Sequence, residues 1–336
     1  MQCRSLRVLL FFSALFLLAV NTPAPLVYRP GEGWSYESAD GSGSWTRTRA
    51  KDQLDVAQQA FEKKNFKLST KAARRVVRIW PFSDYAADAQ FLVGRSYEER
   101  AKDEKAFKAY QELIEKYPKA TKYDEVVKRQ YDIANRYLAG QWFKLWGVIP
   151  FFPSMDKTVQ MYEKLLKNGP YSEVAPSAQM SIGTAREKQS DFPAAVKAYE
   201  AAADKYHDRK EVSADAVYKA GMAYLKQAKT AEYDQSIAGH AISTFTDFMT
   251  LHPRDPRVTE AQKHIATLKM EQARGSMIVA RFYEKKRQWD GALVYYNEVL
   301  IRDPQSEYAE EAKQRIEQIK QRIEEKKQRP LQTAQK

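Results

Sequence analysis

The sequence predicts an all-α fold, a solenoid of about five helical hairpins closed by a C-terminal capping helix. Its 336 residues include only 13 Gly and 14 Pro, and long stretches rich in Ala, Glu, Lys, Gln and Leu favour helix. A short motif also recurs, as "PFSDYAADA" from Pro81, "PYSEVAPSA" from Pro170 and "PQSEYAEEA" from Pro304. Small and bulky residues lie at fixed distances before these prolines. A unit that recurs in this way buries its apolar face only against neighbouring copies, which indicates a stacked array.

The N-terminal residues 1–24 have the layout of a secretory signal sequence. Two Arg precede an apolar run from Val8 to Val20, and small residues follow it. The run is shorter than the about 20 residues that span a bilayer, so an exported, cleaved chain is favoured over an uncleaved anchor. Cys3, the only cysteine, lies before the run. We therefore expect no lipidation site, and no disulfide in the mature chain.

Residues 25–50 are expected to form a flexible or extended leader, because they are rich in Gly and Ser and lack periodicity. The "GSGS" at 41–44 is not followed by the Lys and Ser or Thr of a phosphate-binding loop. The leader is therefore not predicted to bind a nucleotide.

The next stretch, 51–325, is expected to hold the repeats, aligned on the residue that opens each turn. Small residues lie 24 and 12 positions before this residue: Ala57, Gly94, Gly183 and Ala280, and Ser69, Ala106, Ala195, Ala241 and Ala292. Aromatic residues lie eight and 15 positions before it: Tyr110, Tyr162, Tyr199, Phe245 and Tyr296, and Phe66, Phe192 and Trp289. Small residues half a unit apart let two antiparallel helices approach closely, and the aromatic rings fill the remaining space. Within the turn motif, Ser83, Ser172 and Ser306 are predicted to cap the following helix.

This spacing resembles the tetratricopeptide repeat, in which small residues, aromatic residues and a closing proline recur in the same columns. The resemblance implies a right-handed solenoid. An aromatic insertion at 140–154, "GQWFKLWGVIPFFPS", interrupts it and either packs on the solenoid or exposes an apolar patch. Ile316, Ile319 and Ile323 form the apolar stripe of the capping helix, and residues 326–336 are expected to be a frayed basic tail.

Composition argues against catalysis and against nucleic-acid binding. The net charge is +12, but 55 Lys and Arg are interspersed with 43 Asp and Glu, as on solvated helix faces. For an exported protein, anionic lipid or an acidic partner is the favoured target. The four His lack metal-ligand spacing and no nucleophile motif occurs, so we expect no enzyme activity, no metal and no cofactor.

Residues 245–312 resemble the outer-membrane protein assembly factor family BamD, which is a tetratricopeptide-repeat subunit of the barrel-assembly machinery. The resemblance rests on "FTDFMTLHPRDPRVTEAQKHIATLK" and on "ARFYEKKRQWDGALVYYNEVLIRDP". It implies a periplasmic scaffold at the inner leaflet of the outer membrane, whose partners are the barrel-forming BamA-like subunit and unfolded outer-membrane protein precursors.

Site residues follow from the same resemblance. It implies a peptide groove in the first repeats, lined by Gln58, Phe61, Phe91, Arg95 and Glu98. It also implies a partner-binding surface in the last repeats, formed by Leu268, Glu271, Arg274, Arg281 and Arg287. The alternative is a general periplasmic tetratricopeptide scaffold in cell-envelope division or peptidoglycan coordination, although residues 28–50 show no coiled-coil heptads.

Overall fold

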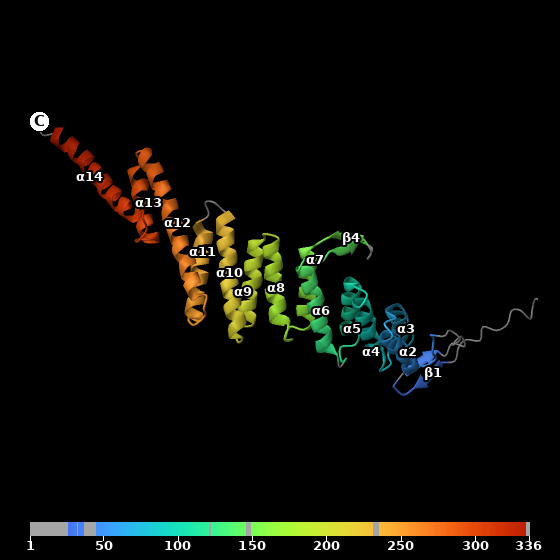
Figure 1. Cartoon of the computed structure of the whole chain (residues 1–336). Helices are drawn as coiled ribbons and strands as arrows, with labels where there is room; N and C mark the ends of the chain where they lie inside the picture. Colours follow the sequence, from blue (N-terminus) through green and yellow to red (C-terminus); the bar gives the residue numbers. More distant parts are fainter. Residues whose placement is uncertain are drawn as a thin grey trace, which may run out of the picture. The chain divides into compact units, whose positions relative to one another are not determined.

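The structure is a computed structural model, which describes residues 26–31, 33–36, 45–120, 122–145, 149–230 and 235–333. The predicted signal sequence, including Cys3, lies outside the described residues. The described part of the chain is mostly helical (Figure 1). Thirteen helices occupy the described residues: α2 (Ala50–Glu62), α3 (Phe66–Ile79), α4 (Ala86–Glu98), α5 (Asp103–Lys116), α6 (Tyr123–Leu138), α7 (Met155–Asn168), α8 (Ala175–Lys188), α9 (Phe192–Lys205), α10 (Lys210–Thr230), α11 (Gln235–Leu251), α12 (Val258–Lys285), α13 (Trp289–Arg302) and α14 (Ala309–Thr333). The predicted all-α repeat fold is confirmed. The described helices form six successive pairs and one closing helix, where about five pairs were expected.

Two two-stranded sheets accompany the helices in the described residues. Strands β1 (Leu26–Arg29) and β2 (Gly33–Tyr36) form a hairpin in which Leu26 lies opposite Tyr36, within the range expected to be the leader. Strands β3 (Phe143–Leu145) and β4 (Ile149–Phe152) pair within the aromatic insertion. The insertion is thus a small hairpin between α6 and α7.

Contacts divide the chain into two compact units, each with its own core. The first extends to residue 133 and also includes 145–149, while the second comprises 134–144 and 150–336. In the first unit α2 packs on α3, α3 on α4, and α4 on α5. In the second, each helix from α7 to α14 packs on the next one in sequence. Each helix therefore contacts its neighbours in sequence, as a repeat architecture requires.

The predicted pairing of small with bulky residues is confirmed. A Cβ atom added to Gly94 would lie 2.3 Å from Tyr110 Cε1, and one added to Gly183 would lie 2.3 Å from Tyr199 Cε1. Both tyrosines are fully buried. The two helices of a hairpin can approach this closely only because the facing residue has no side chain.

The predicted capping role of the turn serines is wrong. The helices after Ser83 and Ser172 begin at Ala86 and Ala175, and neither has a side-chain cap. Each hydroxyl instead donates a hydrogen bond backwards, from Ser83 Oγ to Trp80 O at 3.0 Å and from Ser172 Oγ to Gly169 O at 2.8 Å. Ser306 does the same toward Asp303 O at 2.8 Å. The serines thus close the end of the preceding helix, because an additional turn separates them from the next one.

The C-terminal stripe packs as expected for a cap. Ile316 and Ile319 are buried in one core cluster with Tyr296 and Met277, and Ile323 packs at its edge. Helix α14 continues to Thr333, into the range that we expected to be a frayed tail. The last hairpin therefore has a covered apolar face.

Two adjacent aromatic residues of the insertion differ in exposure. Phe143 is buried and stacks on Tyr137, with ring centroids 4.1 Å apart, while Lys157 Nζ lies 5.0 Å from the Phe143 centroid. The neighbouring Trp142 is 52% exposed. Phe143 therefore packs on the end of α6, as the first of the two alternatives predicts, while Trp142 is exposed.

Candidate functional site

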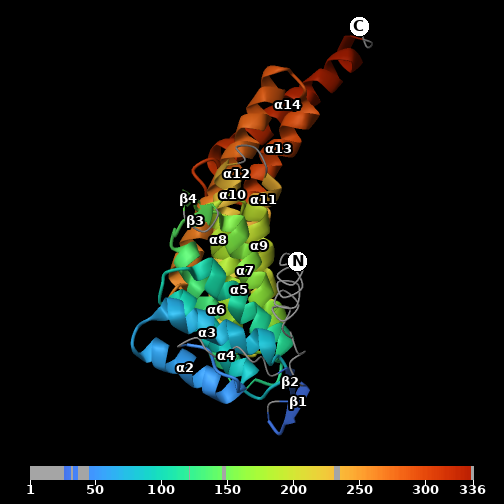
Figure 2. The ribbon, with the colours of Figure 1, turned by 90° about the vertical axis from the view of Figure 1, so that its right-hand side faces the viewer.

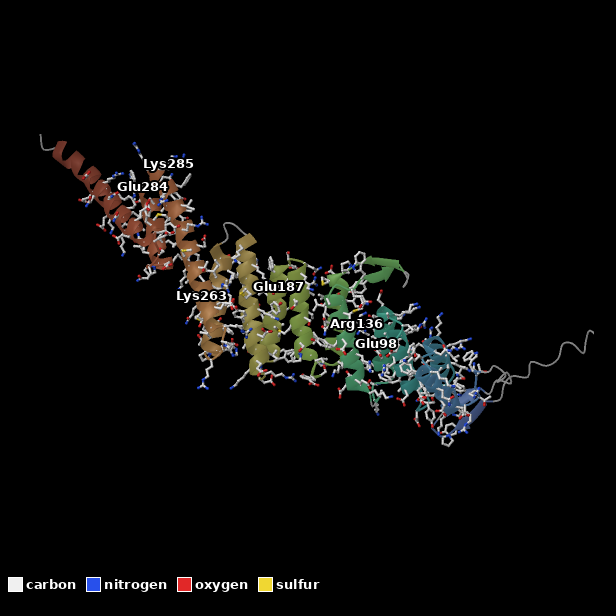
Figure 3. The ribbon with its side chains drawn as sticks, viewed as in Figure 1. Glu98, Arg136, Glu187, Lys263, Glu284 and Lys285 are labelled. Atoms are coloured by element: carbon white, nitrogen blue, oxygen red, sulfur yellow. The ribbon has the colours of Figure 1, made fainter. Side chains whose placement is uncertain are left out.

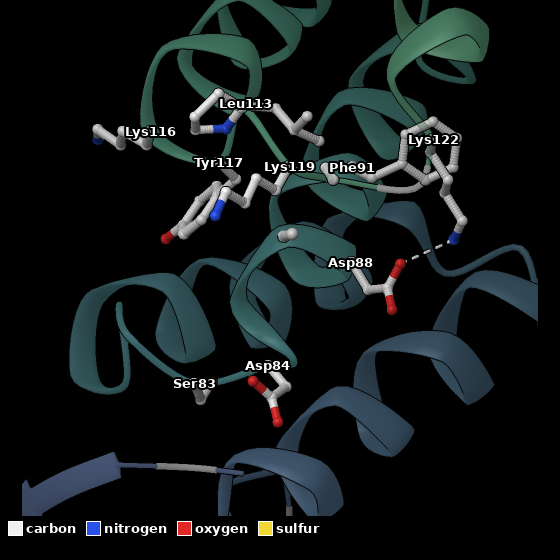
Figure 4. Close-up of a pocket in the computed structure, with 12 residues that line it drawn as sticks. Ser83, Asp84, Asp88, Phe91, Leu113, Lys116, Tyr117, Lys119 and Lys122 are labelled. Carbon is white, nitrogen blue, oxygen red and sulfur yellow. Dashed lines mark ion pairs between the residues drawn. The ribbon is translucent and has the colours of Figure 1, made fainter.

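The first unit contains a cavity of about 480 Å³ between the start of α4 and the end of α5. Figure 4 shows Asp88 and Lys122 as an ion pair on one side of it, with Tyr117 and Lys119 on the other. Phe91 is buried in its wall, with Lys122 Nζ 4.7 Å from the ring centroid. The lining residues are Ser83, Asp84, Ala87, Asp88, Phe91, Leu113, Lys116, Tyr117, Pro118, Lys119, Ala120 and Lys122. An apolar wall with charges of both signs suits a short polypeptide segment.

Four of the five predicted groove residues take part in contacts between the first helices of successive hairpins. The Arg95 guanidinium on α4 lies 5.4 Å from the Phe61 ring centroid on α2, a contact that joins these two helices. Nε of Arg95 is buried and has no hydrogen-bond partner among the described residues. Gln58 is exposed one turn before Phe61. The structure therefore brings Phe61 and Arg95 together and leaves Gln58 exposed.

Glu98 is held by neighbouring side chains. Tyr110 donates a hydrogen bond to Glu98 Oε2 at 2.8 Å, and Arg129 Nη1 lies 3.4 Å from the same oxygen. Burial, followed by the charge of Glu98, raises the pKa of Tyr110 well above its usual range. Glu98 thus fixes α4, α5 and α6 relative to one another, a structural role that competes with the predicted role in ligand binding.

The same arrangement of carboxylate, tyrosine and cation occurs twice more, in the second unit. Tyr199 donates to Glu187 Oε1 at 2.9 Å, and Lys226 from α10 pairs with Glu187. Tyr296 donates to Glu284, whose other oxygen lies 3.6 Å from Arg315 of α14. Figure 3 labels the three carboxylates, Glu98, Glu187 and Glu284. We call each set a Glu-Tyr-cation triad.

The triads were not predicted, although they leave a signal in the sequence. Glu98, Glu187 and Glu284 all lie 20 positions before the residue that opens the turn, in a fourth column beside the small and aromatic ones. Burial also raises the pKa of Tyr199 and of Tyr296, and the adjacent carboxylates add to the effect. The hydroxyls therefore stay protonated and serve as donors.

The predicted partner-binding residues are spread around α12. Leu268 is buried in the core formed with α10 and α11, so it supports the helix and does not present a contact surface. Glu271 and Arg274 form an exposed ion pair at 2.7 Å, and Arg281 pairs with Glu311 of α14 at 2.6 Å. Arg287 lies in the turn after α12 with a φ of 60°, in the left-handed region.

Two exposed apolar residues on α12 were not predicted. Ile278 and Phe282 are 54% and 56% exposed and lie one turn apart, on the side of the helix opposite the buried Ala280. We call these two residues the α12 apolar pair. Arg274 and Lys285 lie one turn before and after it. The sequence contained a signal for this pair. Two apolar residues four positions apart lie on one face of a helix, and this face is not the one that carries the small residue Ala280 and packs in the hairpin.

Within the described part of the chain, no group of three or more His, Cys, Asp or Glu side chains could hold a metal ion. None of the helices in the described ranges is both long and apolar enough to cross a membrane.

Comparison with known proteins follows the division of the chain. Residues 88–120, which span α4 and α5, match the tetratricopeptide repeat family TPR_6, and no curated protein matches the chain. Among solved structures, the chain is similar to the C-terminal part of a TPR repeat-containing protein from Cytophaga hutchinsonii, at 14% identity, 78% coverage of this chain, 87% of that chain and a TM-score of 0.35. It is also similar to a tetratricopeptide repeat protein from Parabacteroides merdae, at 12% identity, 80% and 98% coverage and a TM-score of 0.33.

The second unit carries the more specific match. Residues 153–330, more than half of the chain, match the family YfiO, which is described as "Outer membrane lipoprotein". The matched range begins just before α7 and includes α12, the α12 apolar pair and most of the closing helix. The chain is a tetratricopeptide-repeat protein, and it belongs to the YfiO outer membrane lipoprotein family.

Proposed function

We propose that this chain is a non-catalytic scaffold of the outer-membrane β-barrel assembly complex, located in the periplasm at the outer membrane. It binds the barrel-forming subunit through its C-terminal repeats and unfolded precursor segments in its N-terminal groove. The observation that carries the proposal is the family match over 153–330, which includes the exposed α12 apolar pair.

The surface of α12 has the composition of a protein-binding site. Ile278 and Phe282 provide an apolar centre, and Arg274 and Arg281 lie at its sides, each already oriented by a carboxylate. Aromatic and arginine side chains contribute most to binding energy in interfaces when water is excluded from them. Because ion pairs hold both arginines in place, less conformational entropy is lost on binding.

The test of the C-terminal contact is co-purification from crosslinked cells. Ile278→Ala with Phe282→Ala is expected to abolish recovery of the large barrel-forming subunit with a tagged chain. Ile301→Ala is the matched control, because Ile301 is 78% exposed but lies on α13. Recovery of division or peptidoglycan proteins in place of a barrel-forming subunit would refute the proposal and support the general periplasmic scaffold.

The N-terminal groove is tested separately with a labelled peptide that copies a strand of a barrel precursor. Removing the cation at the Phe61 contact by Arg95→Gln is expected to weaken binding about tenfold, because a buried, charged donor is lost. Lys108→Gln on the other helix of the hairpin is the control, since Lys108 is exposed and lies on α5. Equal binding by both variants and the unmodified chain would remove the groove from the proposal.

A further inference from the structure

Helix α3 presents a continuous basic stripe on its exposed side. Lys67, Lys71, Arg74 and Arg78 are exposed and follow one another at intervals of four, three and four residues, which places them on one face of the helix. At 1.5 Å per residue, the stripe is about 17 Å long. Its opposite face is buried and consists of small or apolar residues: Ser69, Ala72, Ala73 and Val76. We call these four cations the α3 basic stripe.

The stripe has no internal neutralisation. Helix α3 contains no acidic residue, and within the described residues none of its cations forms an ion pair. Lys71 instead lies 4.1 Å from the Trp45 ring centroid, and Arg74 Nη1 lies 3.5 Å from the Tyr97 hydroxyl. Cations on other helices of the chain are paired at one turn, for example Arg129 with Glu125 and Arg302 with Glu298. A row of like charges repels itself, so an external anionic surface is the natural source of compensation.

Exposed aromatic rings lie beyond the C-terminal end of the stripe. Phe82, in the turn after α3, is 91% exposed. Figure 2 shows the β1–β2 hairpin beside the first helices of the chain. It is attached to the turn after α3, because Asp84 N donates a hydrogen bond to Gly31 O at 2.8 Å. This hairpin carries Tyr28 and Trp34, which are 57% and 64% exposed and have ring centroids 5.3 Å apart.

This combination identifies the kind of surface that fits. Basic residues attract anionic lipid headgroups, and aromatic rings are favoured at the level where headgroups meet the acyl chains. An acidic protein or a nucleic acid would also be attracted by the charges, so the experiment below compares polyglutamate and duplex DNA with anionic vesicles.

We propose that the α3 basic stripe, together with Phe82 and the β1–β2 aromatic residues, docks the first unit on an anionic membrane surface. The inference does not rest on the proposed function, since it uses only the charge and exposure of the first unit. Its binding falls as salt rises, because exposed charges are screened beyond about 8–10 Å at physiological ionic strength.

The experiment measures sedimentation of the exported chain, purified from cells, with vesicles. Vesicles of phosphatidylcholine alone are compared with vesicles that also contain phosphatidylglycerol, at low and at high salt. The unmodified chain is expected to sediment with the anionic vesicles and to be released by salt. Replacing all four stripe residues by Gln is expected to weaken this binding several hundredfold, at about fivefold per basic residue.

Two variants make the result specific. The control replaces four exposed lysines elsewhere by Gln and changes net charge equally: Lys105, Lys108, Lys164 and Lys167. This control is expected to retain most of the binding. The second variant, Phe82→Ser with Trp34→Ser, is expected to weaken binding although its net charge is unchanged. Circular dichroism and the denaturant midpoint verify that each variant folds.

Three results would overturn the inference. One is equal sedimentation with neutral and anionic vesicles. Another is a loss of binding in the control variant as large as in the stripe variant. The third is preferential binding of duplex DNA or polyglutamate over anionic vesicles at the same salt, which would make the stripe a site for an acidic macromolecule. Barrel-subunit recovery is measured separately, so that a failure here leaves the proposed scaffold role untouched.

Discussion

Replacing Gly183 by Ala tests the contact on which every hairpin depends. The new Cβ would lie 2.3 Å from Tyr199 Cε1, whereas carbon atoms in favourable contact are about 3.5–4.0 Å apart. The ring or the helix must therefore move by about 1.2 Å, the difference between these distances. Tyr199 is 1% exposed and its hydroxyl is bonded to Glu187, so the ring has no space to move into.

The magnitude follows from three opposing effects. Overpacking a core costs about 1–3 kcal/mol, and losing a buried hydrogen bond to a charged group costs about 1.5–3 kcal/mol. Ala favours helix over Gly by about 1 kcal/mol, which offsets part of this. We expect Gly183→Ala to lower the free energy of unfolding by about 2–4 kcal/mol.

The assay is equilibrium urea unfolding followed by circular dichroism, with the midpoint as the readout. Gly239→Ala is the matched control, because Gly239 is also helical but an added Cβ meets nothing within 4 Å, so this variant is expected to be slightly more stable. Tyr199→Leu, combined with Gly183→Ala, is expected to recover part of the loss, giving a favourable coupling in a double-mutant cycle. A Gly183→Ala variant as stable as the unmodified chain would refute the reasoning on hairpin packing.

Three further perturbations address other features. Burial lowers the pKa of His252, so the unfolded chain binds a proton more readily than the folded chain. Stability is therefore expected to fall as the pH drops below about 6.5. His252→Gln should make this decline shallower in thermal melts recorded between pH 8 and 5. Burial raises the pKa of Tyr296, so this tyrosine loses its proton at lower pH in the unfolded chain than in the folded chain. Stability should therefore decline above about pH 10, and less steeply in Tyr296→Phe. The same dependence of stability on pH in both proteins above about pH 10 would contradict this. Arg287→Gly removes a side chain from a left-handed turn and should stabilise the fold by about 1 kcal/mol in urea unfolding, while reduced recovery of the barrel-forming subunit would show a separate contact role.

The sequence was informative where one residue type serves one purpose. A small residue at Gly94 or Gly183 has no use except close approach, so its spacing from Tyr110 or Tyr199 predicted the hairpin packing correctly. Serine was ambiguous, because its hydroxyl can accept from the next helix or donate to the previous one, and the length of the turn decides between them. That length depends on the three-dimensional course of the chain.

The candidate sites were harder to predict for a related reason. Glu98 was predicted to line the groove, but in the structure it accepts a hydrogen bond from Tyr110 and forms an ion pair with Arg129. Both partners lie on other helices, which the sequence alone does not place beside it. Leu268 was expected on a partner surface, but α12 is one continuous helix whose first half packs against α11. The exposed side of a helix becomes known only when its neighbours are placed, which is also why Ile278 and Phe282 were missed.

The Glu-Tyr-cation triads have a consequence for how the chain can be shortened or recombined. In each triad the tyrosine and the carboxylate belong to one hairpin, and the cation belongs to the helix that follows it. A segment cut between Tyr296 and Arg315 would leave Glu284 beside a buried hydroxyl without its positive partner. The exchangeable module of this protein is therefore a hairpin plus the first helix of the next. Chimeras joined at that boundary keep all three triad carboxylates paired with their cations, and those joined at the turn after the hairpin do not.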